Sequence, residues 1–227
     1  MTTHVALLGH PVSHSRSAVM QNAAFAAAGL DWHYSAFDTH DPLAAVAALR
    51  TLGFAGTNVT IPHKRAVVAV CDEADGESVN TLVFSGRRVV GHNTDREILA
   101  GIESLRACLI GAGGAALALM PALPRDTRIF SRGTRWPPSA EGCDLIVNAT
   151  PVTDVLLVSP RRGQTVVDLA YRGDGGETAL VAAARALGCE VVDGLEALVR
   201  QGAKSFELWT GRAPRLDVMR DAVGAGP

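Results

Sequence analysis

The stretch Ala107-Cys-Leu-Ile-Gly111-Ala-Gly113-Gly114-Ala-Ala116 decides the fold of this chain. Its apolar beginning predicts a strand that ends in a match to the pattern G-x-G-x-x-A, and the Ala- and Leu-rich sequence after it predicts a helix. In a dinucleotide fingerprint, Gly111 permits a tight turn, Gly113 lets a pyrophosphate approach the backbone, and small Ala116 allows close helix–strand packing. A glycine turn can also serve packing alone, but the flanking strand and helix favour a Rossmann-like dinucleotide-binding domain.

Short apolar runs alternate with helical patterns over most of the chain, which predicts an α/β fold with βαβ units and mainly parallel sheets. We expect strands near Val5–Leu8, His33–Phe37, Ala55–Val59, Thr81–Phe84, Arg88–Gly91, Ala107–Ile110, Thr127–Phe130, Leu145–Asn148, Thr165–Leu169 and Glu190–Val192. We expect helices near Ser17–Ala28, Pro42–Leu52, Thr94–Leu105, Gly114–Leu123 and Thr178–Leu187, and closing helices from Leu195 to about Ala222.

The pattern predicts two domains. Residues 1–103, together with about 210–227, are expected to form an open α/β substrate-binding and catalytic domain, and residues 104–209 the Rossmann-like domain. The last helix has no strand after it to pair with, so we expect it to pack back on the first domain. Only ten residues, 133–142, separate Arg132 from Cys143, where the next strand is approached. A helical crossover usually needs a dozen or more, so the second domain is predicted to be shortened by one crossover helix.

Composition excludes several classes of protein. The 227 residues are 48% hydrophobic and carry a net charge of −2, which argues against binding to nucleic acid or to an anionic membrane surface. No apolar run is long enough to span a membrane, and the first residues do not resemble a signal peptide. The four scattered cysteines favour a reduced, cytoplasmic protein without a metal site or disulfides. A homodimer is compatible with the sequence.

The sequence after the second strand of the Rossmann-like domain indicates which dinucleotide is bound. NAD enzymes place an acidic residue about 20 positions beyond the glycine turn, but here Phe130-Ser131-Arg132-Gly133-Thr134-Arg135 supplies arginines. A guanidinium can form a charge-assisted fork to a 2′-phosphate, so we predict NADP, with Arg132 as its main contact and Thr134 as a helper. Alternatively, Arg132 is a solvated charge at the end of a strand. Besides Thr134, the predicted cofactor-binding residues are Gly111, Ala112, Gly113, Gly114, Ala115, Ser131, Arg132, Arg135, Thr150 and Gly194.

Four polar clusters interrupt the apolar elements of the first hundred residues: Ser13–Ser17, Gly56–Lys64, Ser78–Thr81 and Gly91–Asp95. Each lies at the end of a predicted strand, where ligands of open α/β sheets gather. Their hydroxyls, amides, one cation and one carboxylate suit a polyhydroxylated acid. Taken singly, they also fit helix caps, with Ser15 or Ser17 before the first helix and Asn93 or Asp95 before the helix that closes the domain.

Eight segments, in this order, resemble the successive signature blocks of the shikimate dehydrogenase family: GHPVSHSRS, GTNVTIPHK, SVNT, GHNTD, LIGAGGAA, DLIVNATP, VVDLAY and DGLEALVRQGAKSFELWTG. They span the chain from about residue 8 to 211. The resemblance implies an oxidoreductase that reduces 3-dehydroshikimate to shikimate with NADPH, on the pathway to the aromatic amino acids. It also implies the site: Lys64 and Asp95 as the catalytic pair, and Ser15, Ser17, Asn58, Thr60, Asn80, Tyr171 and Gln201 as substrate-binding residues.

The chemistry of Lys64 and Asp95 agrees with this assignment. Hydride transfer to a ketone leaves an alkoxide that needs a proton, which a lysine held by a carboxylate can donate. Three hypotheses remain open: a shikimate dehydrogenase, an enzyme of the same fold acting on quinate or another hydroxylated ring acid, and a non-catalytic ligand-binding protein. The third is suggested by the shortened second domain and by Arg96. The guanidinium of Arg96 competes with Lys64 for the carboxylate of Asp95, adds a contact to an anionic ligand, or points to solvent. His63 and His92 flank the pair either as supporting groups or as simple loop residues.

Overall fold

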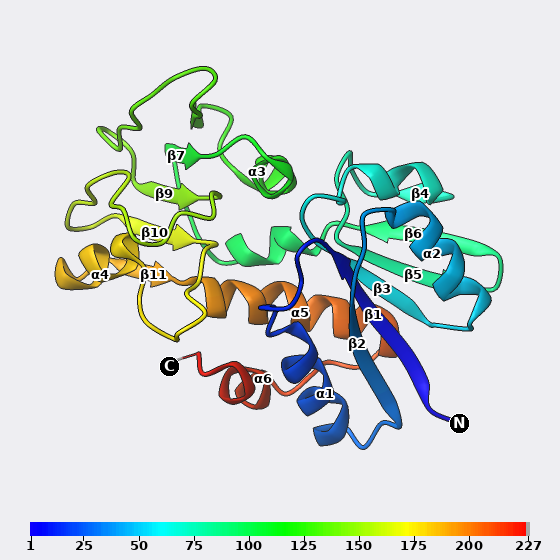
Figure 1. Cartoon of the computed structure of the whole chain (residues 1–227). Helices are drawn as coiled ribbons and strands as arrows, with labels where there is room; N and C mark the ends of the chain where they lie inside the picture. The colour runs from blue at the N-terminus through cyan, green and yellow to red at the C-terminus, as the bar shows by residue number, and fades with distance from the viewer. Residues whose placement is uncertain (226–227) are drawn as a thin grey trace. The chain divides into compact units, whose positions relative to one another are not determined.

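The chain, described over residues 1–225 in a computed structural model, divides into two compact units (Figure 1). The first contains Met1–Glu97 and the chain from Val199 on, and the second contains Ile98–Leu198. These borders differ from those expected at 103/104 and 209/210, and the last two residues of the expected first domain lie outside the described residues. The assignment of the two parts to substrate and to NADP stays a prediction.

The first unit is built on a six-stranded sheet with the order β2-β1-β3-β5-β6-β4. Strand β1 is parallel to its neighbours β2 and β3, whereas β5 is antiparallel to both β3 and β6. The sheet is therefore mixed. Its strands are β1 (Thr3–Gly9), β2 (Trp32–Asp38), β3 (Gly56–Val59), β4 (Glu73–Ala74), β5 (Thr81–Ser85) and β6 (Arg88–His92).

Helices cover both faces of this sheet. Helix α2 (Pro42–Thr51) and the 3-10 helix η1 (Ala66–Val70) bury Val46 and Val67 on one side, whereas α1 (Ser17–Ala27) and α5 (Gly194–Thr210) lie on the other (Figure 1). The rings of Phe25 in α1 and Phe206 in α5 stack with their centroids 5.1 Å apart. Helix α6 (Leu216–Val223) packs on α1, as expected of an element without a strand partner.

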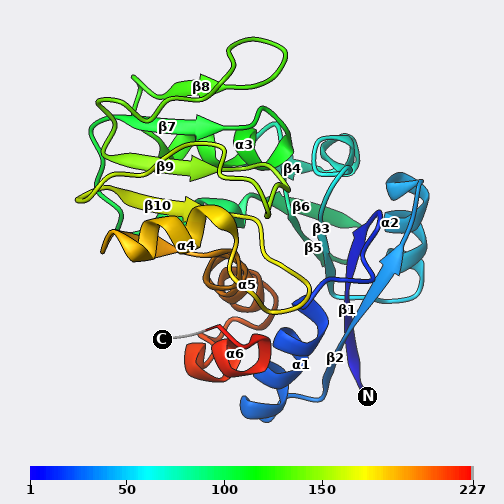
Figure 2. The same ribbon diagram turned by 60° about the vertical axis from the view of Figure 1, so that its left-hand side comes forward.

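The second unit contains five parallel strands in the order β11-β10-β9-β7-β8. Of these, β10, β9, β7 and β8 lie side by side in Figure 2. The chain leaves β7 toward β8 on one side and continues from β9 on the other side. The order therefore reverses between β7 and β9, and ligands of such sheets bind beyond the carboxyl ends of the strands at this point. The strands are β7 (Ala107–Ile110), β8 (Arg128–Phe130), β9 (Leu145–Asn148), β10 (Thr165–Asp168) and β11 (Glu190–Val192).

The two faces of the second sheet are covered unequally. Helix α3 (Gly114–Leu119) and the start of α5 pack on one face, with Ala116, Leu119 and Ala197 in the core. On the other face, α4 (Ala179–Ala186) is the only α-helix among the described residues, and loop residues fill the rest of the core. No helix lies between β8 and β9, which confirms the predicted loss of a crossover helix, and residues 149–164 between β9 and β10 contain none either.

Two expected helices are shorter than the pattern predicted. In place of a helix over Thr94–Leu105, the chain forms only the 3-10 helix η2 (Thr94–Leu99), because Gly101 adopts a positive φ of 77°. Helix α3 passes into the 3-10 helix η3 (Met120–Ala122), since Pro121 has no N–H to continue the α-helical ladder. None of the helices in the described part of the chain is long and apolar enough to cross a membrane.

Candidate active site

The side chains of Lys64 and Asp95 meet within the first unit, although 31 positions separate them in sequence. Lys64 lies in the turn after β3, and Asp95 lies in η2 directly after β6. Lys64 Nζ donates a hydrogen bond to Asp95 Oδ2 at 2.6 Å, and only 11% and 6% of the two side chains are exposed. Little water reaches the two side chains, so the attraction between their charges is weakly screened. The ion pair therefore has a defined geometry, which an exposed ion pair lacks.

Asn80 holds the second oxygen of the same carboxylate. Its Nδ2 donates to Asp95 Oδ1 at 2.7 Å, while its Oδ1 accepts from the Thr94 backbone N–H at 2.8 Å. The sequence suggested that the cluster of Asn80 lies at the carboxyl end of a strand. The structure instead places it at the start of one, because Asn80 directly precedes β5. Because β5 runs antiparallel to β3 and β6, Thr81 lies opposite both Asn58 and His92, and the three clusters share one edge of the sheet.

Asn58 is the centre of a buried hydrogen-bond network. Its Oδ1 accepts from the Tyr34 hydroxyl at 2.8 Å, and its Nδ2 lies within 3.0 Å of Asn80 O, Thr81 Oγ1 and Ser205 Oγ. Burial raises the pKa of Tyr34 well above its usual range, so this hydroxyl keeps its proton and donates. Both ends of the Asn58 amide are engaged within the protein, so a ligand hydroxyl would have to share these groups.

The predicted substrate-binding serines lie next to this network. The Ser15 hydroxyl donates to Ser17 Oγ at 3.1 Å and accepts from the Ser17 backbone N–H at 3.2 Å. Ser17 also lies near Tyr34, where it acts to lower the pKa of that hydroxyl against the larger effect of burial. Helix α1 begins after Arg16 without a side-chain cap, so neither serine serves as its N-cap residue. Asn93, by contrast, accepts from the Asp95 backbone N–H at 3.2 Å and caps η2, which leaves the Asp95 carboxylate for Lys64.

The remaining predicted substrate-binding residues divide between the two units. Gln201 in α5 accepts from Asn80 Nδ2 at 3.4 Å and therefore belongs to the edge that holds Asp95. Thr60 follows β3 and is half-buried, and no other described residue hydrogen-bonds to its hydroxyl. Tyr171 follows β10 in the second unit. Its expected contact with the substrate stays a prediction.

Arg96 does not compete for the catalytic carboxylate. Its Nη2 donates to Asp75 O at 2.5 Å and lies 3.9 Å from the carboxylate of Asp75, a contact that the sequence did not predict. His92 also approaches Asp75, at 3.6 Å. His63 is buried, and its Nε2 bonds to Thr39 O at 2.8 Å, so it holds a loop in place and does not contact the pair.

The glycine turn of the second unit has the conformation that the fingerprint requires. Gly111 has a φ of 117°, and an added Cβ would lie 3.0 Å from Ala149 O. A Cβ at Gly113 would meet nothing within 4 Å, so the backbone there is open to an approaching group. Gly114 and Ala115 begin helix α3, and Ala112 is exposed beside them. This turn lies at the carboxyl end of β7, at the point where the strand order reverses.

A buried carboxylate supports the neighbouring loop. Asp168, which is fully buried, accepts from Asn148 Nδ2 at 2.9 Å and from Thr178 Oγ1 at 2.6 Å. Asn148 in turn accepts from the N–H and the hydroxyl of Thr150 at 3.0 and 2.7 Å. Burial raises the pKa of Asp168, although the hydrogen bonds from Thr178 and Asn148 oppose the shift. The network fixes predicted cofactor residue Thr150 beside the glycine turn.

The predicted NADP-binding arginines lie at the end of β8. The guanidinium of Arg132 lies 5.6 Å from the ring centroid of Trp136, and that of Arg135 lies 5.7 Å from the ring of Phe130. Ser131 bonds to the Thr134 hydroxyl at 2.9 Å. Both arginines are exposed, so their N–H groups are accessible to an anion. Gly194, the last of the predicted set, begins α5, where an added Cβ would lie 2.3 Å from Ala170 O.

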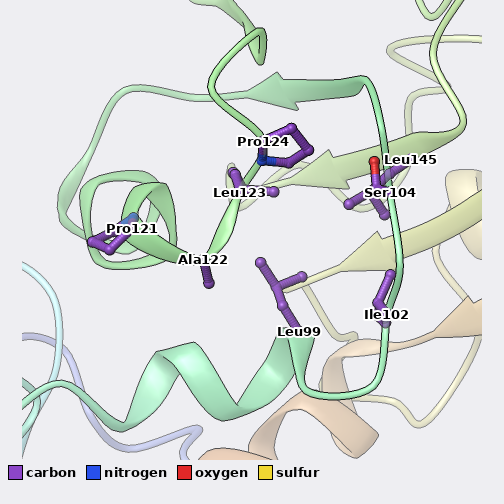
Figure 3. A pocket seen from close by; sticks show the side chains of 8 residues that line it. All are labelled: Leu99, Ile102, Ser104, Pro121, Ala122, Leu123, Pro124 and Leu145. Atoms are coloured by element: carbon purple, nitrogen blue, oxygen red, sulfur yellow. The ribbon is translucent and has the colours of Figure 1, made fainter.

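A cavity of about 260 Å³ in the second unit lies elsewhere (Figure 3). Figure 3 shows it between the segment from Leu99 to Ser104 and the residues Pro121 to Pro124. Leu145, the first residue of β9, also lines it, so the cavity is at the amino ends of the strands. No ionisable side chain lines it, and the glycine turn lies at the opposite edge of the sheet, so it is not the cofactor site.

Comparison with known proteins identifies the family. Residues 7–82 match the model of the shikimate dehydrogenase substrate binding domain, and residues 194–223 match that of the shikimate 5′-dehydrogenase C-terminal domain. A shikimate dehydrogenase (NADP(+)) from Moorella thermoacetica is 38% identical over 97% of this chain and 94% of its own length. The chain belongs to the shikimate dehydrogenase family. Members of this family are oxidoreductases, and the alignment runs over 280 positions, more than the 227 residues of this chain.

Solved structures agree with this assignment. Shikimate 5-dehydrogenase from Thermus thermophilus, in complex with NADP(H) and shikimate, has a TM-score of 0.82 and 34% identity, covering 98% of this chain and 99% of its own. Quinate dehydrogenase from Corynebacterium glutamicum, in complex with NAD, also has a TM-score of 0.82, but only 25% identity, with 99% of both chains covered. The fold is thus that of a family with an N-terminal substrate domain and a Rossmann-like domain.

Sequence reasoning missed four members of the buried network. Tyr34 lies in an apolar strand, and Ser205 lies in a long amphipathic helix, so neither is distinguished from ordinary core and surface positions. Thr81 and Thr94 each follow an asparagine in the pairs Asn80-Thr81 and Asn93-Thr94. This repeated Asn-Thr pair was the one available signal, since Thr94 bonds to Asn80 and its Oγ1 lies 3.3 Å from Thr81 Oγ1.

Proposed function

We propose that Lys64 and Asp95 form the proton-donating pair with which this shikimate dehydrogenase reduces the ring ketone of 3-dehydroshikimate. The observation that carries the proposal is the 2.6 Å hydrogen bond between Lys64 Nζ and Asp95 Oδ2, in a setting where both side chains are almost completely buried. Asp95 is held at its other oxygen by Asn80. A lysine ammonium has three protons, so one can bond to Asp95 while another is donated to a substrate oxygen.

The rest of the first unit supports binding of a polyhydroxylated acid. The hydroxyls of Ser15 and Ser17 lie 3.1 Å apart at the start of α1 and suit the substrate carboxylate. Thr60, Asn80 and Gln201 offer a hydroxyl and two amides near the Lys64–Asp95 pair, which suits the ring hydroxyls. Negative charge develops on the ketone oxygen during reduction, and Lys64 stabilises it before donating its proton.

NADP is the cofactor, and the residues of the second unit fit it. An added Cβ at Gly113 would project into open space, so the glycine leaves the backbone accessible to a pyrophosphate, and Arg132 and Arg135 carry exposed positive charge for a 2′-phosphate. The cofactor supplies the hydride when it is bound. Thr150, fixed through Asn148, is a further predicted contact. We also propose a cytoplasmic location, which the four free cysteines support, and a homodimer, which light scattering can test.

The direct test is a spectrophotometric assay of the purified chain with shikimate or quinate and with NADP⁺ or NAD⁺. We expect reduction of NADP⁺ with shikimate, and weaker activity with each of the other three combinations. Faster turnover of quinate would reassign the substrate, and equal turnover with NAD⁺ would refute the role of Arg132. Binding of shikimate without reduction of either dinucleotide would favour the non-catalytic alternative.

A further inference from the structure

Trp136 is an exposed aromatic residue beside the arginines of the second unit. Its side chain is 42% exposed, although tryptophan has a large apolar surface that folding usually covers. The guanidinium of Arg132 lies 5.6 Å from its ring centroid. A guanidinium stacked on a ring keeps the N–H groups at its edge available to an anion. The two residues thus combine an accessible aromatic surface with a cation.

The loop that carries Trp136 is tied back to the end of β8. The N–H groups of Thr134 and Arg135 both donate to Ser131 O, at 3.1 and 3.0 Å, and Ser131 and Arg135 form an antiparallel bridge. Beyond the tryptophan, Ala140 is 5% exposed and belongs to the core of the sheet. Because the loop is anchored on both sides, Trp136 is held near the carboxyl end of β8.

This end of β8 adjoins the glycine turn. The Gly111 backbone N–H donates to Phe130 O at 2.8 Å, so the last residue of β8 is directly bonded to the first glycine of the fingerprint. In Rossmann-like sheets, the ribose next to the adenine is recognised at the end of this second strand. No helix covers the sheet after β8, since residues 131–144 contain none. The adenine side of the site therefore lacks the wall that a crossover helix provides.

From these observations we infer that Trp136 provides the surface on which the adenine ring of NADP stacks. The inference rests on the proposed function and adds a residue that the dinucleotide fingerprint does not contain. Trp136 supplies a flat ring where the crossover helix is missing, and any adenine-containing ligand can stack on this ring. Arg132, beside it, selects ligands that carry a 2′-phosphate. The two side chains thus have separate effects: Trp136 contributes affinity for the base, and Arg132 contributes the preference for NADP over NAD.

Isothermal titration calorimetry of the full chain tests this inference. Trp136→Ala is expected to raise the dissociation constants of NADP⁺ and of 2′,5′-ADP by roughly 5- to 100-fold, the range found when an aromatic side chain that stacks on a base is removed. Trp136→Phe, which keeps a flat ring, should stay within about 3-fold of the wild type. The dissociation constant of shikimate should not change in either variant, because Trp136 is not among the predicted substrate-binding residues.

Phe37→Ala is the matched control, since Phe37 is an aromatic residue with 41% exposure in the first unit. It should leave binding of 2′,5′-ADP unchanged. Wild-type affinity for 2′,5′-ADP in Trp136→Ala would overturn the inference and leave the proposed function intact. An equal loss of affinity for shikimate and 2′,5′-ADP would also overturn it, because it would indicate general damage to the fold. Failure of the wild-type chain itself to bind NADP⁺ would instead refute the proposed function, and the inference with it.

Discussion

The two units arrange their predicted functional residues in opposite ways. In the first unit, Lys64, Asp95 and Asn80 are almost completely buried and joined by hydrogen bonds of 2.6 and 2.7 Å. In the second unit, Gly113 and Arg132 are exposed, and Gly113 has only backbone groups with which to contact a ligand. Groups that transfer a proton need a fixed geometry, whereas a long, charged ligand can be bound by accessible groups. Substitution of Lys64 or Asp95 should therefore lower kcat, and substitution of Arg132 should raise the KM for the cofactor.

Loss of Lys64 should have the largest effect. Lys64→Ala removes the proton donor and is expected to lower kcat by roughly 100-fold or more, the usual scale of general acid–base catalysis. The measurement is steady-state oxidation of shikimate at saturating NADP⁺. Lys204→Ala is the matched control, because this exposed lysine forms an ordinary ion pair with Glu207 at 2.9 Å. Near-normal turnover in Lys64→Ala would end the proposed role of the pair.

Asp95 should act through Lys64 and not independently. Asp95→Ala is expected to lower kcat by about 100-fold as well, because the ammonium loses the group that orients it. If the two residues work as one unit, the double variant should be little worse than Lys64→Ala alone, since the effects of such pairs are far from additive. Multiplicative losses in the double variant would show that the two side chains act separately.

Loss of Arg132 should affect only cofactor binding. Arg132→Ala is expected to raise the KM for NADP⁺ by roughly 10-fold or more, since a hydrogen bond to a charged group contributes about 1.5–3 kcal/mol. The KM for NAD⁺ should change by less than about 2-fold, because NAD⁺ has no 2′-phosphate, and kcat should be unchanged. Parallel increases in both KM values would contradict the assignment and would weaken the contrast between the two units.

Removal of one hydroxyl should test whether the buried network positions the substrate residues. Tyr34→Phe leaves Asn58 Oδ1 without the hydroxyl that now bonds to it. We expect a loss of about 1–3 kcal/mol in the free energy of unfolding, the cost of a buried polar group without a partner. The KM for shikimate should rise by a few-fold while the KM for NADP⁺ stays constant. An unchanged KM for shikimate would limit Tyr34 to a role in stability.

Asp168, the buried carboxylate that holds the loop beside the glycine turn, should make the stability of the protein depend on pH. Burial raises its pKa in the folded state above the ordinary value of 3.8, so the folded protein binds this proton more tightly than the unfolded chain does. The contribution of Asp168 to the free energy of unfolding is complete at pH values below the ordinary pKa. This contribution is lost as the pH rises through the higher pKa that the group has in the folded protein. Urea unfolding from pH 4 upward should therefore show wild type losing stability relative to Asp168→Asn. A constant difference across this range would contradict the shift.

Much of the fold could be predicted because its signals are local. The glycine turn directly follows its strand, the arginines directly follow the apolar residues of β8, and the ten residues 133–142 are fewer than a helical crossover usually needs. The direction of β5 could not be predicted, because an apolar strand has the same pattern whichever way it runs. The helix expected over Thr94–Leu105 does not continue past Gly101, which has a positive φ. The tertiary structure determines this backbone angle, and the periodic pattern of the sequence does not reveal it.

The site divides in the same way. Lys64 and Asp95 were identified from short motifs, but only the fold brings positions 31 residues apart into contact. Asn58 was expected to bind substrate. The sequence around it does not indicate that its side chain forms hydrogen bonds with Tyr34 and Ser205. These bonds depend on which strands are neighbours and on where α5 passes, and neither is encoded by residues near Asn58. Hydrogen-bond partners across a sheet are therefore the least predictable part of such a site.

Strand β8 is three residues long and forms one edge of the second sheet. A long uncovered edge invites pairing with another chain, so its brevity protects this shortened unit from aggregation without a covering helix. The same brevity makes the end of the sheet easy to open, because few hydrogen bonds hold it to β7. Nucleotide binding should then slow hydrogen exchange more in this strand than in β9 or β10, and the order of this edge would depend on the ligand it helps to bind.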